Sequence, residues 1–139
     1  MKLVALLIAS VAVAACASQD DKAEQSTQDT AQAVRDFIEV RKLEELKKLS
    51  TGSGDRWTSI KDEFLIYEGR RDTYLVAFYR HCYELSDNTR IVADKRWDSN
   101  NIHSGSDTIR GCRIDKIYAL TEAEAAELEN IGEAPGSRN

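Results

Sequence analysis

The chain has 139 residues, with 19 Lys and Arg against 24 Asp and Glu, and a formal net charge of −5. This length accommodates one compact domain and excludes a multidomain machine. Nucleic acid is excluded as a partner, because its binding depends on Lys and Arg side chains that neutralise phosphates, and this chain is acidic. Hydrophobic residues make up 42% of the chain and charged residues 31%, which predicts one modest core in a polar body.

Residues 1–15 have the pattern of an export signal. Met1 and Lys2 give a positive start, and Leu3–Ala15 is apolar except for Ser10. As a helix this apolar stretch would span roughly 20 Å, which is too short for a hydrocarbon core of about 30 Å. A positive start, a short apolar run and small residues after it are typical of a signal peptide. We therefore expect residues 1–15 to be a signal peptide and not a membrane-spanning helix.

The residues Val13-Ala14-Ala15-Cys16 resemble the lipobox of bacterial lipoproteins, in which the cysteine becomes the first mature residue. The resemblance implies diacylglycerol on the sulfur of Cys16 and a further acyl chain, such as palmitate, on its amine. Several acyl chains anchor a protein durably, whereas one holds it only marginally. Ala17 follows in place of Asp, and by the sorting rule of enteric bacteria this implies the outer membrane, with the domain on the periplasmic face. The alternative is a plain secretory signal with an incidental cysteine.

Residues 17–30 are polar and include no large apolar side chain, so the segment cannot bury enough surface to fold. We therefore expect residues 16–30, which begin with the lipidated cysteine, to form a flexible tether with a reach of roughly 20 Å. A single globular domain is expected over residues 31–132, followed by a disordered tail over residues 133–139.

The start of the domain is ambiguous in the sequence. Between residues 31 and 49 the apolar side chains recur at every third position, whereas an amphipathic helix combines steps of three and four. These side chains are Val34, Phe37, Val40, Leu43, Leu46 and Leu49. The pattern fits one long helix, and it fits equally a short helix that changes into a strand near Phe37–Leu43.

Five runs of β-branched, aromatic and other apolar residues predict strands. They are Trp57–Ile60, Phe64–Tyr67, Thr73–Tyr79, Arg90–Ala93 and Arg113–Leu120. The charged segment Glu68–Asp72 contains a glycine and predicts a hairpin loop, and the polar segment Asp98–Asp107 predicts a longer loop. A helix is predicted after Thr121, which is a good N-cap with Glu124 at the capping-box position, and Gly132 ends it.

Cys82 and Cys112 are an even pair in a chain that we expect to be exported to an oxidising compartment. A disulfide between them would close a loop of about thirty residues and contribute roughly 3–4 kcal/mol on the chain-entropy model. The alternatives are redox-active or free thiols and a zinc site with His81 and His103, although the spacing matches none of the usual zinc-binding pairs. The predicted fold is α+β: a small antiparallel β-sheet of about five strands, open or curled into a partial barrel, with a C-terminal helix and one disulfide.

Four motifs, taken in order, resemble a known family. They are Phe64-Leu65-Ile66-Tyr67, Thr73-Tyr74-Leu75-Val76, Cys82-Tyr83-Glu84-Leu85 and Gly111-Cys112-Arg113-Ile114. The chain is similar, over about Phe37–Leu120, to small proteobacterial lipoproteins grouped as a domain of unknown function. The resemblance implies a β-rich periplasmic domain with Cys82 and Cys112 paired, and it favours a strand over Phe37–Leu43. It carries no catalytic residue across.

Side chains with catalytic potential occur, but not in patterns that predict an enzyme. His103, Ser104, Ser106 and Asp107 lie within five residues, and neighbours in sequence rarely form a triad, so we expect a hydrogen-bonded loop. The adjacent carboxylates Asp62 and Glu63 are expected to face solvent. Asp98–Asn101 lacks the spacing of an EF-hand, and no phosphate-binding or dinucleotide motif is present. We therefore predict no catalytic residue, no cofactor and no bound metal ion.

Trp57, Tyr67 and Trp97 would form a binding surface if they were exposed together, although a small domain needs most of its aromatic side chains in the core. Arg70-Arg71 and Lys95-Arg96 suit anionic head groups or peptidoglycan, or are ordinary loop charges. The expected function is a non-enzymatic envelope lipoprotein, held to the membrane by its lipid anchor, that binds a protein or an envelope polymer. The alternative is a periplasmic module that binds a small ligand or a metal ion.

Overall fold

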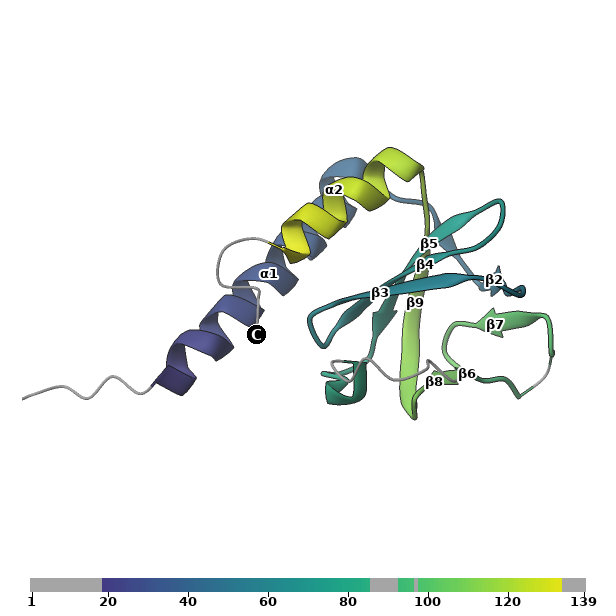
Figure 1. Cartoon of the computed structure of the whole chain (residues 1–139), viewed down its shortest axis with the longest axis horizontal. Helices are drawn as coiled ribbons and strands as arrows, with labels where there is room; N and C mark the ends of the chain where they lie inside the picture. The colour runs from purple at the N-terminus through teal and green to yellow at the C-terminus, as the bar shows by residue number, and fades with distance from the viewer. Residues whose placement is uncertain (1–18, 86–92, 97, 134–139) are drawn as a thin grey trace, which may run out of the picture.

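The computed structural model describes residues 19–85, 93–96 and 98–133. Several predicted features lie outside these residues: the signal peptide, Cys16, Trp97, nearly all of the strand Arg90–Ala93 and nearly all of the tail 133–139. Figure 1 shows the described elements and labels both helices and most of the strands. They are α1 (Gln19–Arg41), β1 (Glu45–Leu46), β2 (Lys48–Ser50), β3 (Arg56–Ile60), β4 (Phe64–Glu68), β5 (Thr73–Phe78), the 3₁₀ turn η1 (Tyr83–Leu85), β6 (Ala93–Asp94), β7 (Asn101–His103), β8 (Thr108–Ile109), β9 (Cys112–Leu120) and α2 (Glu122–Gly132).

The strands form one curled antiparallel sheet in the order β3-β4-β5-β9-β8-β6, and β1 also pairs with β9. The long strand β9 lies along β5 on one side, while its other side is shared by β8 near Cys112 and by β1 near Tyr118. The register shifts between Ala77 and Phe78, which face Lys116 and Ile114, so Asp115 is an extra residue in β9; a bulge of this kind bends the strand that carries it and increases the local twist. β2 and β7 form a separate two-stranded ribbon. The prediction of an α+β fold with a half-barrel sheet and a C-terminal helix is confirmed.

The sheet buries apolar side chains on both of its faces. Along β4, Phe64 and Ile66 point toward the helices, and Leu65 and Tyr67 point into the curl of the sheet, as the alternation of a strand requires. We call these two sets the helix-side core and the inner core. The helix-side core comprises Ala31, Val34, Phe37, Ile60, Phe64, Ile66, Leu75, Tyr118, Ala125 and Leu128. The inner core comprises Leu49, Leu65, Tyr67, Tyr74, Val76, Phe78, Cys82, Leu85, Ile102, Ile109, Cys112, Ile114 and Ile117.

α1 runs through two segments for which other structures were expected. The prediction of a strand near Phe37–Leu43 is wrong, because α1 continues to Arg41. Residues 19–30 are also helical, although a flexible tether was expected there. The buried positions Ala31, Val34 and Phe37 form one helical face, whereas Val40 is 78% exposed and does not belong to it. Packing of these turns against the sheet offsets the free-energy cost of forming the first helical turn. The polar residues before Thr30 then extend a helix that has already formed.

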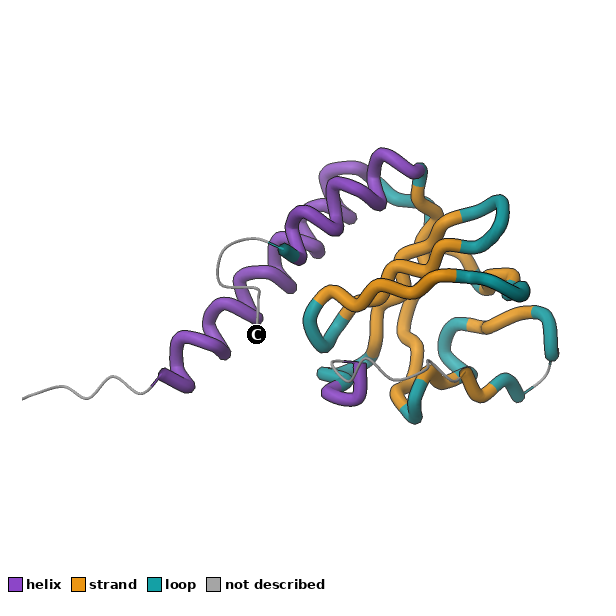
Figure 2. Tube along the Cα trace, viewed as in Figure 1, coloured by secondary structure: helices purple, strands orange, loops and turns teal. Residues whose placement is uncertain are grey.

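The two helices lie alongside each other at one side of the sheet, as Figure 2 shows, and Arg41 of α1 pairs with Glu127 of α2 at 2.6 Å. Thr121 caps α2, and its hydroxyl accepts a hydrogen bond from the Glu124 backbone N–H while the Glu124 carboxylate accepts one from the Thr121 backbone N–H. The predicted capping box is therefore confirmed. Among the described helices, none combines the length and the apolar character needed to cross a bilayer.

The segment Asp98–Asp107, expected to be a loop throughout, contains a strand. Asn101–His103 forms β7, which pairs with Lys48–Ser50 of β2. The reason is that Ile102 and Leu49 are buried together in the inner core, so a short ribbon forms around them. Apart from β7 the segment is irregular, as its composition predicts.

Candidate functional site

Cys82 and Cys112 form a disulfide with a sulfur–sulfur distance of 2.03 Å, as predicted. Cys82 lies just after β5, where its backbone N–H donates to the Asp62 carbonyl at 2.6 Å, and Cys112 begins β9. Both cysteines are buried in the inner core. The bond therefore ties the chain that leaves β5 to the start of the long strand β9.

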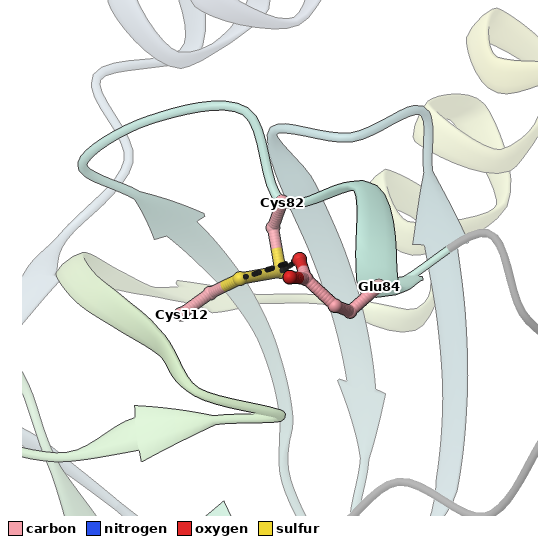
Figure 3. A group of neighbouring side chains, drawn as sticks. All are labelled: Cys82, Glu84 and Cys112. Carbon is pink, nitrogen blue, oxygen red and sulfur yellow. Dashed lines mark hydrogen bonds between the residues drawn. A yellow bond between two sulfur atoms is a disulfide. The ribbon is translucent and has the colours of Figure 1, made fainter.

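A carboxylate lies directly against this disulfide. Oε2 of Glu84 is 3.6 Å from Sγ of Cys82 and 3.3 Å from Sγ of Cys112, as Figure 3 shows. Glu84 belongs to the exposed turn η1, so its charge faces both the disulfide and solvent. Among the described residues these three side chains form the one close group of potential metal ligands. With the disulfide formed, neither sulfur is a thiolate, the form that binds metals.

The structure does not bring together the four residues considered as a zinc site from the sequence, Cys82, Cys112, His81 and His103. His81 lies 3.3 Å from a Glu63 carboxylate oxygen, and His103 lies 3.4 Å from an Asp107 carboxylate oxygen, so each imidazole has a partner other than the cysteines. Glu63 also pairs with Arg35 of α1, and its side chain is only 13% exposed. The expectation that Glu63 faces solvent is wrong, because it links α1 to the turn between β3 and β4.

The cluster of His103, Ser104, Ser106 and Asp107 is organised around a fully buried carboxylate. Asp107 accepts hydrogen bonds from the backbone N–H groups of His103 at 2.8 Å and of Arg96 at 3.2 Å. Burial raises the pKa of the Asp107 carboxyl, but these hydrogen bonds outweigh it and hold the pKa below its usual value. The two serine hydroxyls donate to the Lys47 carbonyl and to Asp107. The described contacts are those of a hydrogen-bonded loop, as predicted.

The predicted aromatic surface does not form as expected. Tyr67 is completely buried, and its ring contacts Trp57 edge-on at 4.3 Å between centroids and stacks on Tyr74 at 5.9 Å. Tyr67 is therefore a core residue, and its assignment to a binding surface is wrong. Trp57 is half-buried on β3. The alternation along β4 explains the difference, because it turns Tyr67 into the curl of the sheet.

The hairpin between β4 and β5 has a charged tip that we call the arginine turn, Gly69–Asp72. The turn is closed by a hydrogen bond from the Gly69 N–H to the Asp72 carbonyl at 2.9 Å, which confirms the predicted hairpin loop. A Cβ at Gly69 would lie 3.1 Å from that carbonyl and 3.3 Å from the Tyr67 ring, so the close approach favours glycine. Arg70 and Arg71 are exposed and have no ion-pair or hydrogen-bond partner within the described part of the chain.

Two cavities flank the arginine turn. One, of about 310 Å³, lies between the turn and the segment Ser50–Asp55, with the buried Tyr67 and Tyr74 at its lining. The other, of about 470 Å³, lies between the turn and the start of α2. Burial is the main cause that raises the pKa of the Tyr74 hydroxyl, and the negative charge of Asp72 adds to it. Sequence analysis found the two arginines but had no signal for the cavities, because segments distant in sequence form their walls.

The strand β3 forms an edge of the sheet. Within the described residues it pairs with β4 alone, which leaves the hydrogen-bonding groups on its other side without a strand partner. A groove of about 380 Å³ runs beside it, lined by all of β3 and by Glu129, Gly132 and Glu133 at the end of α2. An unpaired edge beside a groove is a place where a further strand can add to a sheet.

Comparison with known proteins places the chain in a family. None of the curated proteins and none of the solved structures compared with it matches. The family model described as "Family of unknown function (DUF6491)" matches residues 1–133, a longer stretch than the one that carried the resemblance in the sequence. The chain therefore belongs to DUF6491, a family of unknown function.

Proposed function

We propose that this protein is a non-enzymatic envelope lipoprotein that binds a protein or an envelope polymer. In this proposal acyl chains on Cys16 anchor it to the outer membrane, and the domain faces the periplasm. The observation that carries the anchoring is the sequence Val13-Ala14-Ala15-Cys16 directly after a short apolar run. Two or three acyl chains are sufficient for durable attachment without a membrane-spanning helix.

The helix α1 bears on how the domain would be held. Among the residues whose burial is described, Thr30 is the first buried one in α1, and the helical residues 19–29 precede it. At about 1.5 Å per residue this stretch is roughly 16 Å long. In the proposal it acts as a short, stiff spacer between the anchor and the sheet.

The buried disulfide supports an envelope location. Disulfides persist in oxidising compartments such as the bacterial periplasm and are rare in the cytosol. Cys82 and Cys112 are both buried in the inner core, where the bond is part of the packing of the domain. A protein that depends on such a bond is suited to export.

The β3 edge and its groove support binding of a partner protein as an extended strand. The backbone groups of the edge supply hydrogen bonds, and the groove beside α2 offers room for alternate side chains of the added strand. A second candidate, binding of a ligand in a pocket, is favoured by the two cavities at the arginine turn.

Fractionation tests the anchor. Cys16→Ser is expected to move the protein from the membrane fraction to the soluble periplasmic fraction, because no acyl chain can be attached. Retention of the variant in the membrane would contradict the proposed anchor.

In-cell photo-crosslinking tests the edge. A crosslinker placed at Ser59, exposed on β3, is expected to capture one abundant envelope protein reproducibly, and a crosslinker at Asp36, exposed on α1, is expected not to. Mass spectrometry identifies what is captured. The same capture from both positions, or none from Ser59, would contradict protein binding at the edge.

A further inference from the structure

We propose that the arginine turn binds an acidic glycan, a polyhydroxylated sugar chain that carries carboxylates. This inference rests on the proposed function, in which the domain faces the envelope polymers, and it assigns one of those polymers to a site.

In the described part of the chain, the turn carries two unpaired guanidiniums at adjacent positions. Arg35, Arg41 and Arg56 each pair with a glutamate, as expected where carboxylates outnumber cations. Within the described residues Arg70 and Arg71 have no such partner, although both line the two cavities. A guanidinium presents its hydrogen-bond donors in a fixed geometry that matches the two oxygens of a carboxylate. Two adjacent unpaired guanidiniums can therefore bind a carboxylate.

The groups around the arginines select the class of anion. Asp55 and Asp72 line the smaller cavity together with the hydroxyl-bearing residues Ser50, Thr51 and Tyr74. Two carboxylates so close would repel a compact anion such as phosphate, and a neutral sugar would leave both guanidiniums without a counter-charge. A sugar with a carboxylate suits both the aspartates and the arginines. Its hydroxyls donate to the aspartates, and its carboxylate accepts from the arginines.

The walls of the smaller cavity are held in place before any ligand binds. The Gly52 N–H donates to Asp55 at 2.5 Å and to the Tyr67 hydroxyl at 3.3 Å, which fixes the loop after β2 to the inner core. Lys95 donates to the Thr51 hydroxyl at 2.6 Å. Preorganised walls reduce the entropy lost on binding.

The position of the turn favours a chain over an isolated small molecule. Gly69, Arg70, Arg71, Asp72 and Tyr74 line both cavities, so the turn stands between two spaces of about 310 Å³ and 470 Å³. A ligand that continues across the turn would occupy both spaces and pass both guanidiniums. A polymer of linked sugars has this form.

Binding of the purified lipoprotein, held in neutral detergent micelles, tests the inference. The probes are N-acetylmuramic acid, N-acetylglucosamine, which lacks the carboxylate, and glycan strands of peptidoglycan whose stem peptides an amidase has removed, which frees the carboxylate of each muramic acid. We expect measurable binding of the acidic sugar and of the freed glycan strands, with the neutral sugar about tenfold weaker, since a hydrogen-bonded charge pair is lost. Equal binding of the two sugars would overturn the role of the carboxylate.

Matched variants locate the site. Arg70→Gln and Arg71→Gln are each expected to weaken binding about tenfold, because each removes a charged hydrogen-bond donor. Arg80→Gln is the control, since Arg80 is exposed beyond the other end of β5 and lines neither cavity. Unchanged binding in both arginine-turn variants, or an equal loss in Arg80→Gln, would overturn the site.

A competition experiment with an anionic lipid tests the alternative ligand, a lipid head group. Micelles doped with phosphatidylglycerol are added as a competitor, and we expect them not to displace the freed glycan strands. Displacement by the lipid, together with no response to N-acetylmuramic acid, would overturn the inference and assign the turn to anionic head groups. Neither result affects the fractionation of Cys16→Ser or crosslinking from Ser59, so failure of this site and failure of the proposed function remain distinguishable.

Discussion

The strand β5 connects two regions in which charged side chains have different roles. Before it lies the arginine turn, where Arg70 and Arg71 have no polar partner within the described residues. Beyond it lies the disulfide region, where Glu63 pairs with Arg35 and the buried Asp107 near β9 accepts two backbone hydrogen bonds. Charges with partners inside the protein stabilise the fold, whereas free guanidiniums keep their donors available to a ligand. Substitutions should therefore affect stability in one region and binding in the other.

The largest loss of stability is expected from removing the disulfide. Cys82→Ala combined with Cys112→Ala should lower the free energy of unfolding by roughly 3–4 kcal/mol, because the unfolded chain gains the entropy of an open loop of about thirty residues. Urea denaturation of both proteins, under the same non-reducing conditions, measures the difference. A change below about 1 kcal/mol would contradict this expectation, because the disulfide would then not be a main source of the stability of the domain.

Replacing the buried carboxylate should have the next largest effect. Asp107→Asn is expected to destabilise the domain by about 2 kcal/mol, because an amide nitrogen replaces one oxygen that accepts backbone hydrogen bonds. The lowered pKa of Asp107 stabilises the fold at pH values above its unfolded pKa, and this stabilisation is lost as the pH falls through the folded value. Acid unfolding should therefore be less pH-dependent in the variant. Asp94→Asn, an exposed aspartate on β6, is the control and should match the wild type.

The carboxylate against the disulfide should slow its reduction to a smaller extent. Glu84→Gln is expected to speed reduction by glutathione a few-fold, because it removes a negative charge that repels the attacking thiolate. Cysteamine, whose ammonium offsets the thiolate charge, should show less change. The rates are followed by thiol labelling, with Glu122→Gln, at an exposed position that begins α2, as the matched control. If Glu84→Gln sped reduction equally by glutathione and by cysteamine, Glu84 would act by blocking access to the disulfide and not through its charge.

The arginine turn should contribute least to stability. Arg70→Gln combined with Arg71→Gln is expected to change the free energy of unfolding by less than about 0.5 kcal/mol, as for exposed residues without partners. Arg35→Gln, which breaks the pair with Glu63, should destabilise by up to about 1 kcal/mol. Thermal unfolding of these variants measures the difference between the two regions. A larger loss in the arginine turn than in Arg35→Gln would contradict it.

Much of the local structure follows from the sequence because its causes are local. The apolar runs that become β3, β4, β5 and β9 carry their own β preference, and the Thr121–Glu124 capping box satisfies backbone donors within one helical turn. The hairpin loop needs only a glycine and polar neighbours. With Cys16 set aside by its lipobox-like motif, the other two cysteines leave one connectivity, so the disulfide could be predicted without knowing the fold.

Other features depend on partners that are distant along the chain. The length of α1 depends on the packing of Ala31 and Val34 against the sheet, and β7 depends on the contact between Ile102 and Leu49. The burial of Tyr67 follows from which face of β4 turns into the curl. The cavities and the β3 edge exist only once separate segments meet, because shape and pairing belong to the assembled surface and no single segment encodes them.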